Sequence, residues 1–329
     1  MSSATIDIVA IGDAIVDVIA TCDEAFLDAH RLPKGSMQLL TPAAADTLYN
    51  AMGSARETSG GSAANTMAGV AAMGGGAAFI GQTADDQLGK IFAHDMRALG
   101  VRFDTPPLQD SPLPTGRCLI LVTPDAQRTM NTCPGASHEL TTARLDEDLV
   151  RSAAIVYLEG YLWGPDGPRA AMERAVAIAH DAGRKVALTL SESVSIAGRK
   201  ESFARMIDAG GIDLLFANED ELFQLAGRTD LEGALADIAA KVPTLVVTRG
   251  PAGAMAIEDG RRIDIPAAPL TTLVDTTGAG DLFAAGFLTA RCKGTDLQRQ
   301  LWTGAIAAAE VISHFGARPE GDLKAMVAL

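Results

Sequence analysis

Short apolar runs rich in β-branched residues alternate along this chain with longer, alanine-rich amphipathic stretches. This alternation is typical of parallel strands joined by crossover helices, because such strands are buried on both faces and a covering helix on only one. The runs predict strands at 6–11, 77–80, 153–158, 185–189, 214–217 and 244–248, and helices at 63–73, 88–99, 168–182, 201–209, 220–226 and 231–241. We therefore expect an α/β fold with a mainly parallel sheet flanked by helices.

Two regions, 14–40 and 102–131, do not follow this alternation. Short β-prone pieces within them, such as 117–122, lie among prolines and polar residues. The regions could form a small strand-built subdomain outside the main sheet or long surface loops, although long loops without structure are uncommon in compact domains. A length of 329 residues is compatible with one large domain, so we expect residues 1–329 to fold as a unit.

The chain is acidic, with a formal net charge of −14. An acidic surface opposes broad attraction to nucleic acids or anionic membranes, so we expect neither as a partner. Residues 1–20 contain no Lys or Arg, unlike a signal peptide, and no apolar run reaches the length of a membrane span. We therefore expect a cytoplasmic protein. The four cysteines lack the paired spacing of a zinc site.

The run 275–281 reads Asp-Thr-Thr-Gly-Ala-Gly-Asp and is followed by an apolar helical stretch. Its small residues Gly278, Ala279 and Gly280 let a ligand approach the backbone, and N–H groups at the start of a helix favour anions. Asp281, in the first helical turn, is placed to accept a proton from an attacking hydroxyl group. The alternative is an ordinary helix start with an acidic first turn.

A second cluster, Gly60-Gly61-Ser62-Ala63-Ala64-Asn65, begins another predicted helix. Two glycines permit backbone contact with a ligand, and Asn65 offers both a donor and an acceptor. Asp13 and Asp17 follow the first strand at its carboxyl end, where open α/β sheets bind ligands. The vicinal hydroxyls of a sugar would suit these carboxylates, whereas solvated turn residues are the alternative.

A third cluster follows the strands at 214–217 and 244–248. Asn218 and Glu221 offer oxygen ligands that suit Mg²⁺, and an ordinary helix N-cap explains them equally well. Thr248, Arg249 and Gly250 end the next strand, and Arg249 could supply the positive charge that an anionic co-substrate needs. The sequence lacks a P-loop, a Gly-x-Gly-x-x-Gly dinucleotide motif and a Gly-x-Ser-x-Gly nucleophile elbow.

Taken in order, these clusters resemble the ribokinase-like (PfkB) carbohydrate and nucleoside kinase family from about residue 6 to residue 319. The resemblance rests on Gly-Gly-x-x-x-Asn at 60–65 and on Asp-Thr-x-Gly-Ala-Gly-Asp at 275–281, of which the second is highly specific. It implies a Rossmann-like core with a small β-strand lid from about 14–40 and 102–131. It also implies phosphoryl transfer from ATP with Mg²⁺.

The resemblance assigns roles to the residues of each cluster. Asp281 would be the catalytic base, and the N–H groups of Gly278, Ala279 and Gly280 would form an anion hole. Asn218 and Glu221 would position Mg²⁺ largely through water, with Thr248, Arg249 and Gly250 along ATP. Sugar hydroxyls would bind Asp13, Asp17, Gly61 and Asn65. A monovalent cation such as K⁺ would bind the carbonyls of Asp275 and Thr277.

The substrate is expected from the details of this resemblance. Residues 12–17, 115–118 and 129–132 look most like bacterial adenosine kinase-like members, which implies the 5′ hydroxyl of adenosine as acceptor. Asp13 departs from eukaryotic adenosine kinases, which carry Asn there. A flat apolar slot for a base would come from Met37, Leu39 and Leu40 with Tyr161, Leu162 or Trp163, unless these residues are plain core.

Two alternatives to a nucleoside kinase remain open. One is a sugar kinase acting on ribose, fructose or 2-keto-3-deoxygluconate, and the other is a non-catalytic sensor with the same fold. The resemblance is compatible with either a monomer or a homodimer.

Overall fold

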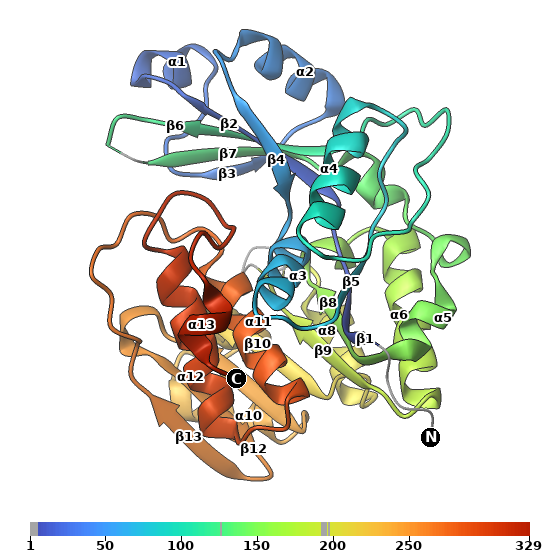
Figure 1. The fold of residues 1–329 in the computed structure, drawn as a ribbon, viewed down its shortest axis with the longest axis vertical. Helices are drawn as coiled ribbons and strands as arrows, with labels where there is room; N and C mark the ends of the chain where they lie inside the picture. Colours follow the sequence, from blue (N-terminus) through green and yellow to red (C-terminus); the bar gives the residue numbers. More distant parts are fainter. Residues whose placement is uncertain (1–5, 126, 192–195, 197) are drawn as a thin grey trace.

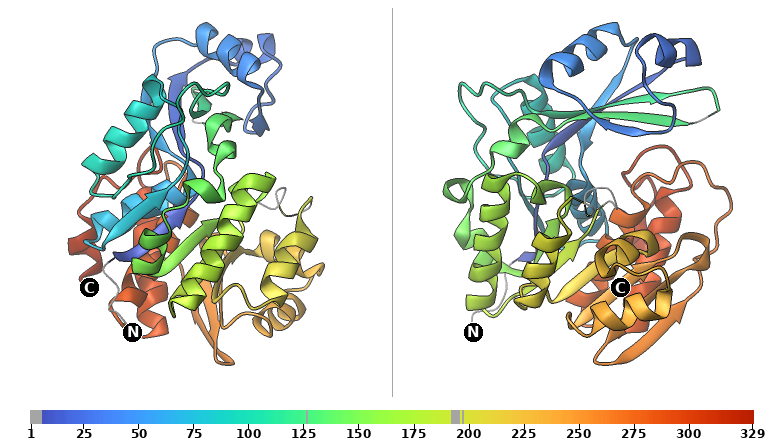
Figure 2. Two further views of the ribbon diagram at one scale, coloured as in Figure 1. Left: turned by 90° about the vertical axis from the view of Figure 1, so that its right-hand side faces the viewer. Right: turned by 180° about the vertical axis from the view of Figure 1, so that it is seen from behind.

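The computed structural model describes residues 6–125, 127–191, 196 and 198–329. Residues 1–5 of the predicted domain and Ala126 of the predicted lid lie outside the described residues. Two sheets organise the chain, one in the main body and one at the end of the molecule that is uppermost in Figures 1 and 2. None of the described helices is long and apolar enough to cross a membrane.

The main sheet has eight strands in the order β13-β12-β11-β10-β9-β8-β1-β5. Its first six strands along the chain pair in parallel, and β12 and β13 add an antiparallel edge. The strands are β1 (Ile6–Ile11), β5 (Ala77–Ile80), β8 (Ala153–Glu159), β9 (Lys185–Thr189), β10 (Leu214–Asn218), β11 (Thr244–Thr248), β12 (Ala254–Glu258) and β13 (Arg261–Ile265).

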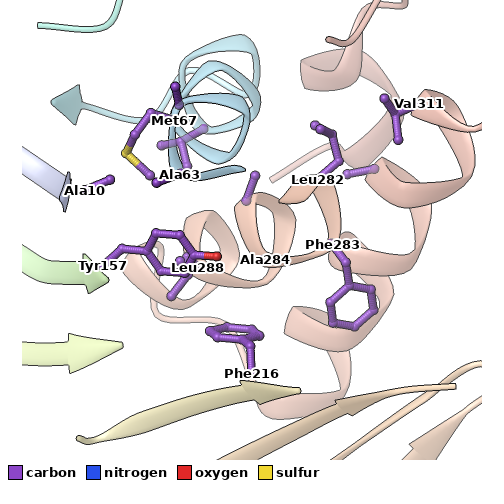
Figure 3. Packing of buried hydrophobic residues seen from close by; sticks show 14 of the residues in the cluster. Ala10, Ala63, Met67, Tyr157, Phe216, Leu282, Phe283, Ala284, Leu288 and Val311 are labelled. Carbon is purple, nitrogen blue, oxygen red and sulfur yellow. The ribbon is translucent and has the colours of Figure 1, made fainter. Parts of the chain in front are cut away.

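Helices cover both faces of this sheet, because successive side chains of each buried strand point to opposite faces. Ile8 and Ala10 of β1 belong to one hydrophobic cluster, while Val9 and Ile11 belong to the other. The first cluster is covered by α3 (Ser62–Ala72), α4 (Gln87–Ala98), α11 (Ala279–Cys292), α12 (Leu297–Val311) and α13 (Leu323–Val327), and part of it is shown in Figure 3. The second is covered by α5 (Glu147–Ser152), α6 (Asp166–Asp181), α8 (Lys200–Asp208), α9 (Glu219–Ala226) and α10 (Leu231–Ala239).

The predicted fold class is confirmed, and the predicted strands agree with the observed ones to within one residue. The antiparallel strands β12 and β13, of which β13 forms the edge, were not predicted. The sequence of β13, Arg-Arg-Ile-Asp-Ile, is polar because an exposed edge strand buries little of its surface.

The second sheet has five strands in the order β3-β7-β6-β2-β4. They are β2 (Ile15–Thr21), β3 (Met37–Leu39), β4 (Arg56–Gly60), β6 (Gly116–Val122) and β7 (Arg128–Cys133). One face, with Val16, Val18 and Leu119, is buried with residues of α1 (Glu24–Ala29) and α2 (Pro42–Ala51). The other face presents Ile15 and Ile120 to a cavity.

The boundaries of this sheet differ from the predicted 14–40 and 102–131 in two ways. Strand β4 was missed because Arg-Glu-Thr-Ser-Gly is polar and ends in glycine. The predicted range 102–131 also begins too early, since Arg102 and Leu108 form bridges with Ala78 and Ala84 beside the main sheet.

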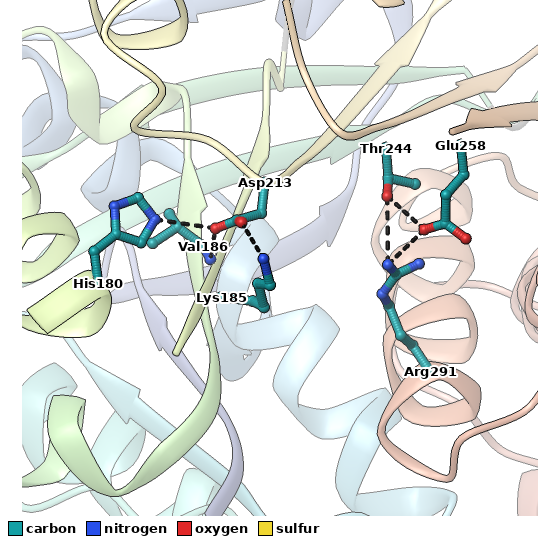
Figure 4. A network of polar contacts seen from close by, with 7 residues as sticks. All are labelled: His180, Lys185, Val186, Asp213, Thr244, Glu258 and Arg291. Atoms are coloured by element: carbon teal, nitrogen blue, oxygen red, sulfur yellow. Dashed lines mark hydrogen bonds and ion pairs between the residues drawn. The ribbon is translucent and has the colours of Figure 1, made fainter. Parts of the chain in front are cut away.

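Two polar networks lie where strands of the main sheet begin (Figure 4). Asp213 accepts hydrogen bonds from Lys185 at 2.6 Å and from the N–H of Val186 at 2.9 Å. Glu258 accepts from Arg291 at 2.6 Å and from Thr244 at 2.7 Å. These groups satisfy one another at the end of the sheet opposite the cavity, so they hold the fold together and are not part of a site.

Candidate active site

A cavity of about 540 Å³ lies between the carboxyl ends of the main-sheet strands and the apolar face of the second sheet. Its size and mixed lining are typical of small-molecule sites. Most of the residues predicted to form a site line it together: Asp13, Asp17, Met37, Leu39, Gly61, Asn65, Tyr161, Asn218, Glu221, Thr248, Thr277, Gly278, Ala279, Gly280 and Asp281. Arg249, Gly250 and Asp275 do not line it.

Asp281 lies in the first helical turn of α11, which Gly278 precedes as the N-cap residue. Gly278 has φ of 78°, and a Cβ there would lie 2.8 Å from Cα of Ala317, so the turn requires glycine. The Asp281 carboxylate accepts hydrogen bonds from Ser62 Oγ at 2.6 Å and Asn65 Nδ2 at 2.9 Å. Desolvation raises the pKa of Asp281, whereas these two hydrogen bonds lower it. The carboxylate is thus held by donors from α3.

The glycine pair before α3 makes room for the carboxylate of Asp17 and for the backbone of Asp13. A Cβ at Gly60 would lie 2.3 Å from the Asp17 carboxyl carbon, and one at Gly61 would lie 2.4 Å from the carbonyl oxygen of Asp13. Gly61 also has φ of 90°, which side chains rarely adopt. Oδ1 of Asn65 is buried and accepts no hydrogen bond from the described residues, so it is available to a ligand hydroxyl.

Asp13 lies in a buried acidic corner that also contains Glu159, the last residue of β8. The N–H of Asp13 donates to Glu159 Oε1 at 2.5 Å, and the N–H of Ala63 donates to Oε2 at 2.7 Å. Asp13 also accepts from Ser137 Oγ at 2.6 Å. Desolvation raises the pKa of Asp13 and raises the pKa of Glu159 further, because the charge of Asp13 adds to the effect.

Glu159 was missed in the sequence, although a glutamate directly after an apolar strand was a usable signal. Asp17, which also lines the cavity, has a pKa raised to about 6 by desolvation, against the opposing charges of Arg318 and Arg128. At the acidic end of the cavity, keeping the carboxylates ionised therefore costs free energy unless a ligand donates hydrogen bonds to them.

Arg128 of β7 lies beside the turn 275–278, whereas Arg249, at which local positive charge was predicted, forms no hydrogen bond or ion pair with this turn among the described residues. Its Nη2 lies 2.8 Å from Oδ2 of Asp275, and its Nη1 donates to Thr277 Oγ1 at 3.1 Å. Arg249 instead pairs with Glu219 at 3.1 Å and does not line the cavity. Arg128 went unnoticed because only the fold brings β7 against the turn 275–278.

Asn218 and Glu221 are compatible with both interpretations of their sequence, a helix N-cap and a Mg²⁺ site. Asn218 caps α9, accepting from the N–H of Glu221 at 2.8 Å, and the Glu221 carboxylate accepts from the N–H of Asn218 at 3.0 Å and from its Nδ2 at 2.9 Å. Both residues also line the cavity. Because these bonds engage the carboxylate, the pair fits Mg²⁺ bound through water better than direct coordination.

Much of the apolar lining comes from the second sheet: Ile15, Met37, Leu39, Cys118, Ile120 and Met130. Phe216, Ala217 and Phe283 add apolar surface from the main body. Leu39 keeps 67% of its surface exposed. Of residues 161–163, Tyr161 lines the cavity, whereas Leu162 and Trp163 are buried in the second hydrophobic cluster. Leu162 and Trp163 therefore follow the alternative of plain core, and Leu40 packs against the first cluster.

Comparison with known proteins gives a consistent result. Residues 5–322 match the pfkB family carbohydrate kinases. The adenosine kinase of Saccharomyces cerevisiae is 27% identical over 93% of this chain and 96% of its own length. Two crystal structures superimpose over 98% of this chain. A probable sugar kinase from Rhizobium etli is 41% identical with a TM-score of 0.92 over 97% of that chain, and the adenosine kinase from Sinorhizobium meliloti is 43% identical with a TM-score of 0.91 over 98%.

Proposed function

Because this chain belongs to the pfkB family of carbohydrate kinases, it is a phosphotransferase that acts on an alcohol group, and we propose that its acceptor is the 5′ hydroxyl of adenosine or a closely related nucleoside. The observation that carries this proposal is the apolar face of the second sheet. Met37, Leu39 and Ile120 face the cavity, where a free sugar offers little apolar surface to cover them. A nucleobase would bury this face.

Asp281 acts as the general base in the proposed reaction. It accepts the proton of the 5′ hydroxyl as the hydroxyl oxygen bonds to the γ-phosphorus of ATP, and the bond from that phosphorus to the bridging oxygen of ADP breaks. The N–H groups of Gly278, Ala279 and Gly280, at the start of α11, stabilise the charge that develops on the phosphoryl oxygens. Ser62 and Asn65 hold the base in place.

The acidic end of the cavity binds the ribose. Asp13 and Asp17 accept hydrogen bonds from vicinal hydroxyls, Oδ1 of Asn65 accepts another, and Gly61 allows the sugar to approach the backbone. Hydroxyl donors satisfy carboxylates that desolvation otherwise disfavours, so this end selects a neutral, hydroxyl-rich ligand.

The phosphate end holds ATP with its cations. Thr248 would lie along the nucleotide, and Asn218 and Glu221 would hold Mg²⁺ through water. When bound, Mg²⁺ would neutralise charge on the phosphates. The carbonyls of Asp275 and Thr277 would hold a monovalent cation such as K⁺. Arg128, reaching from the second sheet to this turn, provides positive charge near the phosphates when the sheet closes as a lid.

A sugar kinase is the second candidate, since the acidic end would equally bind a free sugar and a probable sugar kinase is among the similar structures. The non-catalytic sensor considered from the sequence is not supported, because the chain is a member of a kinase family. The two kinase hypotheses differ in whether the apolar face contributes to acceptor binding.

A substrate panel separates these hypotheses. ATP consumption would be measured with Mg²⁺, with and without K⁺, against adenosine, inosine, guanosine, cytidine, ribose, fructose and 2-keto-3-deoxygluconate. Turnover of a nucleoside at micromolar concentration supports the proposal. Turnover of a free sugar alone would overturn the nucleoside assignment and leave the kinase activity intact.

A further inference from the structure

Residues 316–318, between α12 and α13, lie directly against the turn 275–278. The N–H of Gly316 donates to Oδ2 of Asp275 at 2.9 Å. Ala317 packs so closely on Gly278 that its Cα would lie 2.8 Å from a Cβ at that glycine. A displacement of the turn 275–278 would therefore move residues 316–318, because the backbones of the two segments are in contact.

Arg318, the last residue of this segment, holds the junction between the second sheet and α3. Its Nη2 donates to the carbonyl oxygen of Ser59 at 2.8 Å, and its Nη1 donates to that of Ala64 at 2.7 Å. Ser59 belongs to β4 and Ala64 to the first turn of α3, so the two bonds span the glycine pair 60–61. A planar guanidinium fixes both carbonyls in one geometry, which a single-point donor cannot do.

We propose that Arg318 is a positioning residue that couples the nucleotide-binding turn 275–281 to residues 59–64, which join β4 of the second sheet to α3 and which we term the hinge. The inference rests on the proposed function only in taking this turn as the phosphate site. Arg318 is absent from the cavity lining, so it acts through Ser59, Ala64 and the backbone at 316–317 and not by touching a ligand.

The charge of Arg318 is consistent with this position. It lowers the pKa of Asp281 and that of Asp17, opposing the desolvation of both carboxylates. Arg128 contacts the same turn from β7, at the far side of the second sheet from β4. Two arginines thus join the turn to the second sheet, Arg128 from β7 and Arg318 through Ser59 of β4. They act beside the direct hydrogen bonds of Ser62 and Asn65 to Asp281.

Hydrogen–deuterium exchange tests the coupling without any acceptor. The full chain would be measured with and without the non-hydrolysable ATP analogue AMP-PNP and Mg²⁺, as wild type and as Arg318→Met, Arg318→Lys and Arg299→Met. Arg299 is the matched control, because it also donates to two backbone carbonyls, those of Val327 and Ala328, but at the C-terminus of the chain away from the hinge.

We expect AMP-PNP to slow exchange of the amides at 56–64 by about tenfold in the wild type and in Arg299→Met, a typical size for coupling between two sites. In Arg318→Met the effect should fall below about twofold while protection of the turn 276–282 by the analogue persists. Should that variant not fold, Arg318→Lys carries the test, since it keeps the charge but loses the bidentate contact, and protection of 56–64 should fall below that of the wild type.

Two results would overturn the proposal: full protection of 56–64 in a folded Arg318 variant, or no protection of 56–64 in the wild type. Failure of the nucleoside assignment is visible separately, in the substrate panel. The exchange experiment depends on the ATP analogue alone and not on the identity of the acceptor.

Discussion

Replacing Asp281 by Asn removes the proposed base with little change to its surroundings. In the protein, Asn65 Nδ2 and Ser62 Oγ both donate to the carboxylate. An amide can keep its oxygen toward Asn65 and turn its NH₂ toward Ser62, whose hydroxyl accepts equally well. The neutral side chain also relieves a desolvated charge, because desolvation raises the pKa of Asp281. The fold and the acceptor affinity should therefore be retained.

The expected loss of rate follows from the role of the base. General base catalysis contributes about 10²- to 10⁴-fold, which corresponds to about 3 to 5 kcal/mol of transition-state stabilisation. We expect kcat to fall by that factor, with the dissociation constant of the acceptor changed by less than about threefold and the melting temperature at pH 8 unchanged or higher.

The assay is coupled ADP release under saturating ATP and acceptor, alongside calorimetric binding of the acceptor. Asp296→Asn is the control, since Asp296 caps α12 through the N–H of Arg299 and Asn caps a helix equally well. A kcat for Asp281→Asn within about tenfold of the wild type would refute the assignment of the base, because no positioned proton acceptor would then be needed.

Three further predictions follow from the same geometry. Since the pKa of Asp17 is raised to about 6 in the folded protein, the ionised side chain lowers the free energy of unfolding above that pH. Asp17→Asn should therefore raise the free energy of unfolding by about 1 to 3 kcal/mol at pH 8, measured by urea titration, while it weakens acceptor binding. An unchanged free energy of unfolding would contradict this prediction. Gly278→Ala should lower the free energy of unfolding by about 1 to 3 kcal/mol and reduce kcat, because φ is 78° and Ala317 occupies the space of the new Cβ. In Gly280→Ala the new Cβ has no atom within 4 Å, so this variant should melt at or above the wild-type temperature. Leu39→Asp should raise the KM of a nucleoside by about tenfold with little effect on the melting temperature. Leu99→Asp is the control and should leave KM unchanged, because Leu99 is exposed outside the cavity. Equal KM values for the two variants would argue against the apolar slot.

Much of this arrangement was predictable because strands such as β8 and β10 are apolar up to their last residue, which is polar in both. The turn 275–281 and the glycine pair 60–61 were recognisable because each contains a glycine, Gly278 or Gly61, whose positive φ other residues rarely adopt. The structure also brings Asp13, Asp17 and Asp281 to one cavity, as the strand ends implied.

The residues that were missed share a different property. Arg128, Arg318 and Glu159 act through contacts between elements far apart in sequence, and an isolated arginine or glutamate carries no local pattern. Arg249 was preferred as the positive group because it directly follows a strand, yet its neighbour Glu219 neutralises it. Trp163 was placed in the slot for its type, although its ring stacks on Phe203 in the core.

The place of β1 in the main sheet bears on how the chain reaches its native state. This strand precedes both of its partners in the sequence, since it lies between β8 and β5, with Ile8 paired to Ala77 on one side and Ile155 on the other. Until β8 has left the ribosome, Ile-Asp-Ile-Val-Ala-Ile has one partner strand at most. Such long-range parallel pairing folds slowly, and an unpaired apolar strand is prone to aggregate in the meantime. Slow translation, low temperature or a chaperone that shields the first residues should therefore increase the soluble yield more than any change at the C-terminal end.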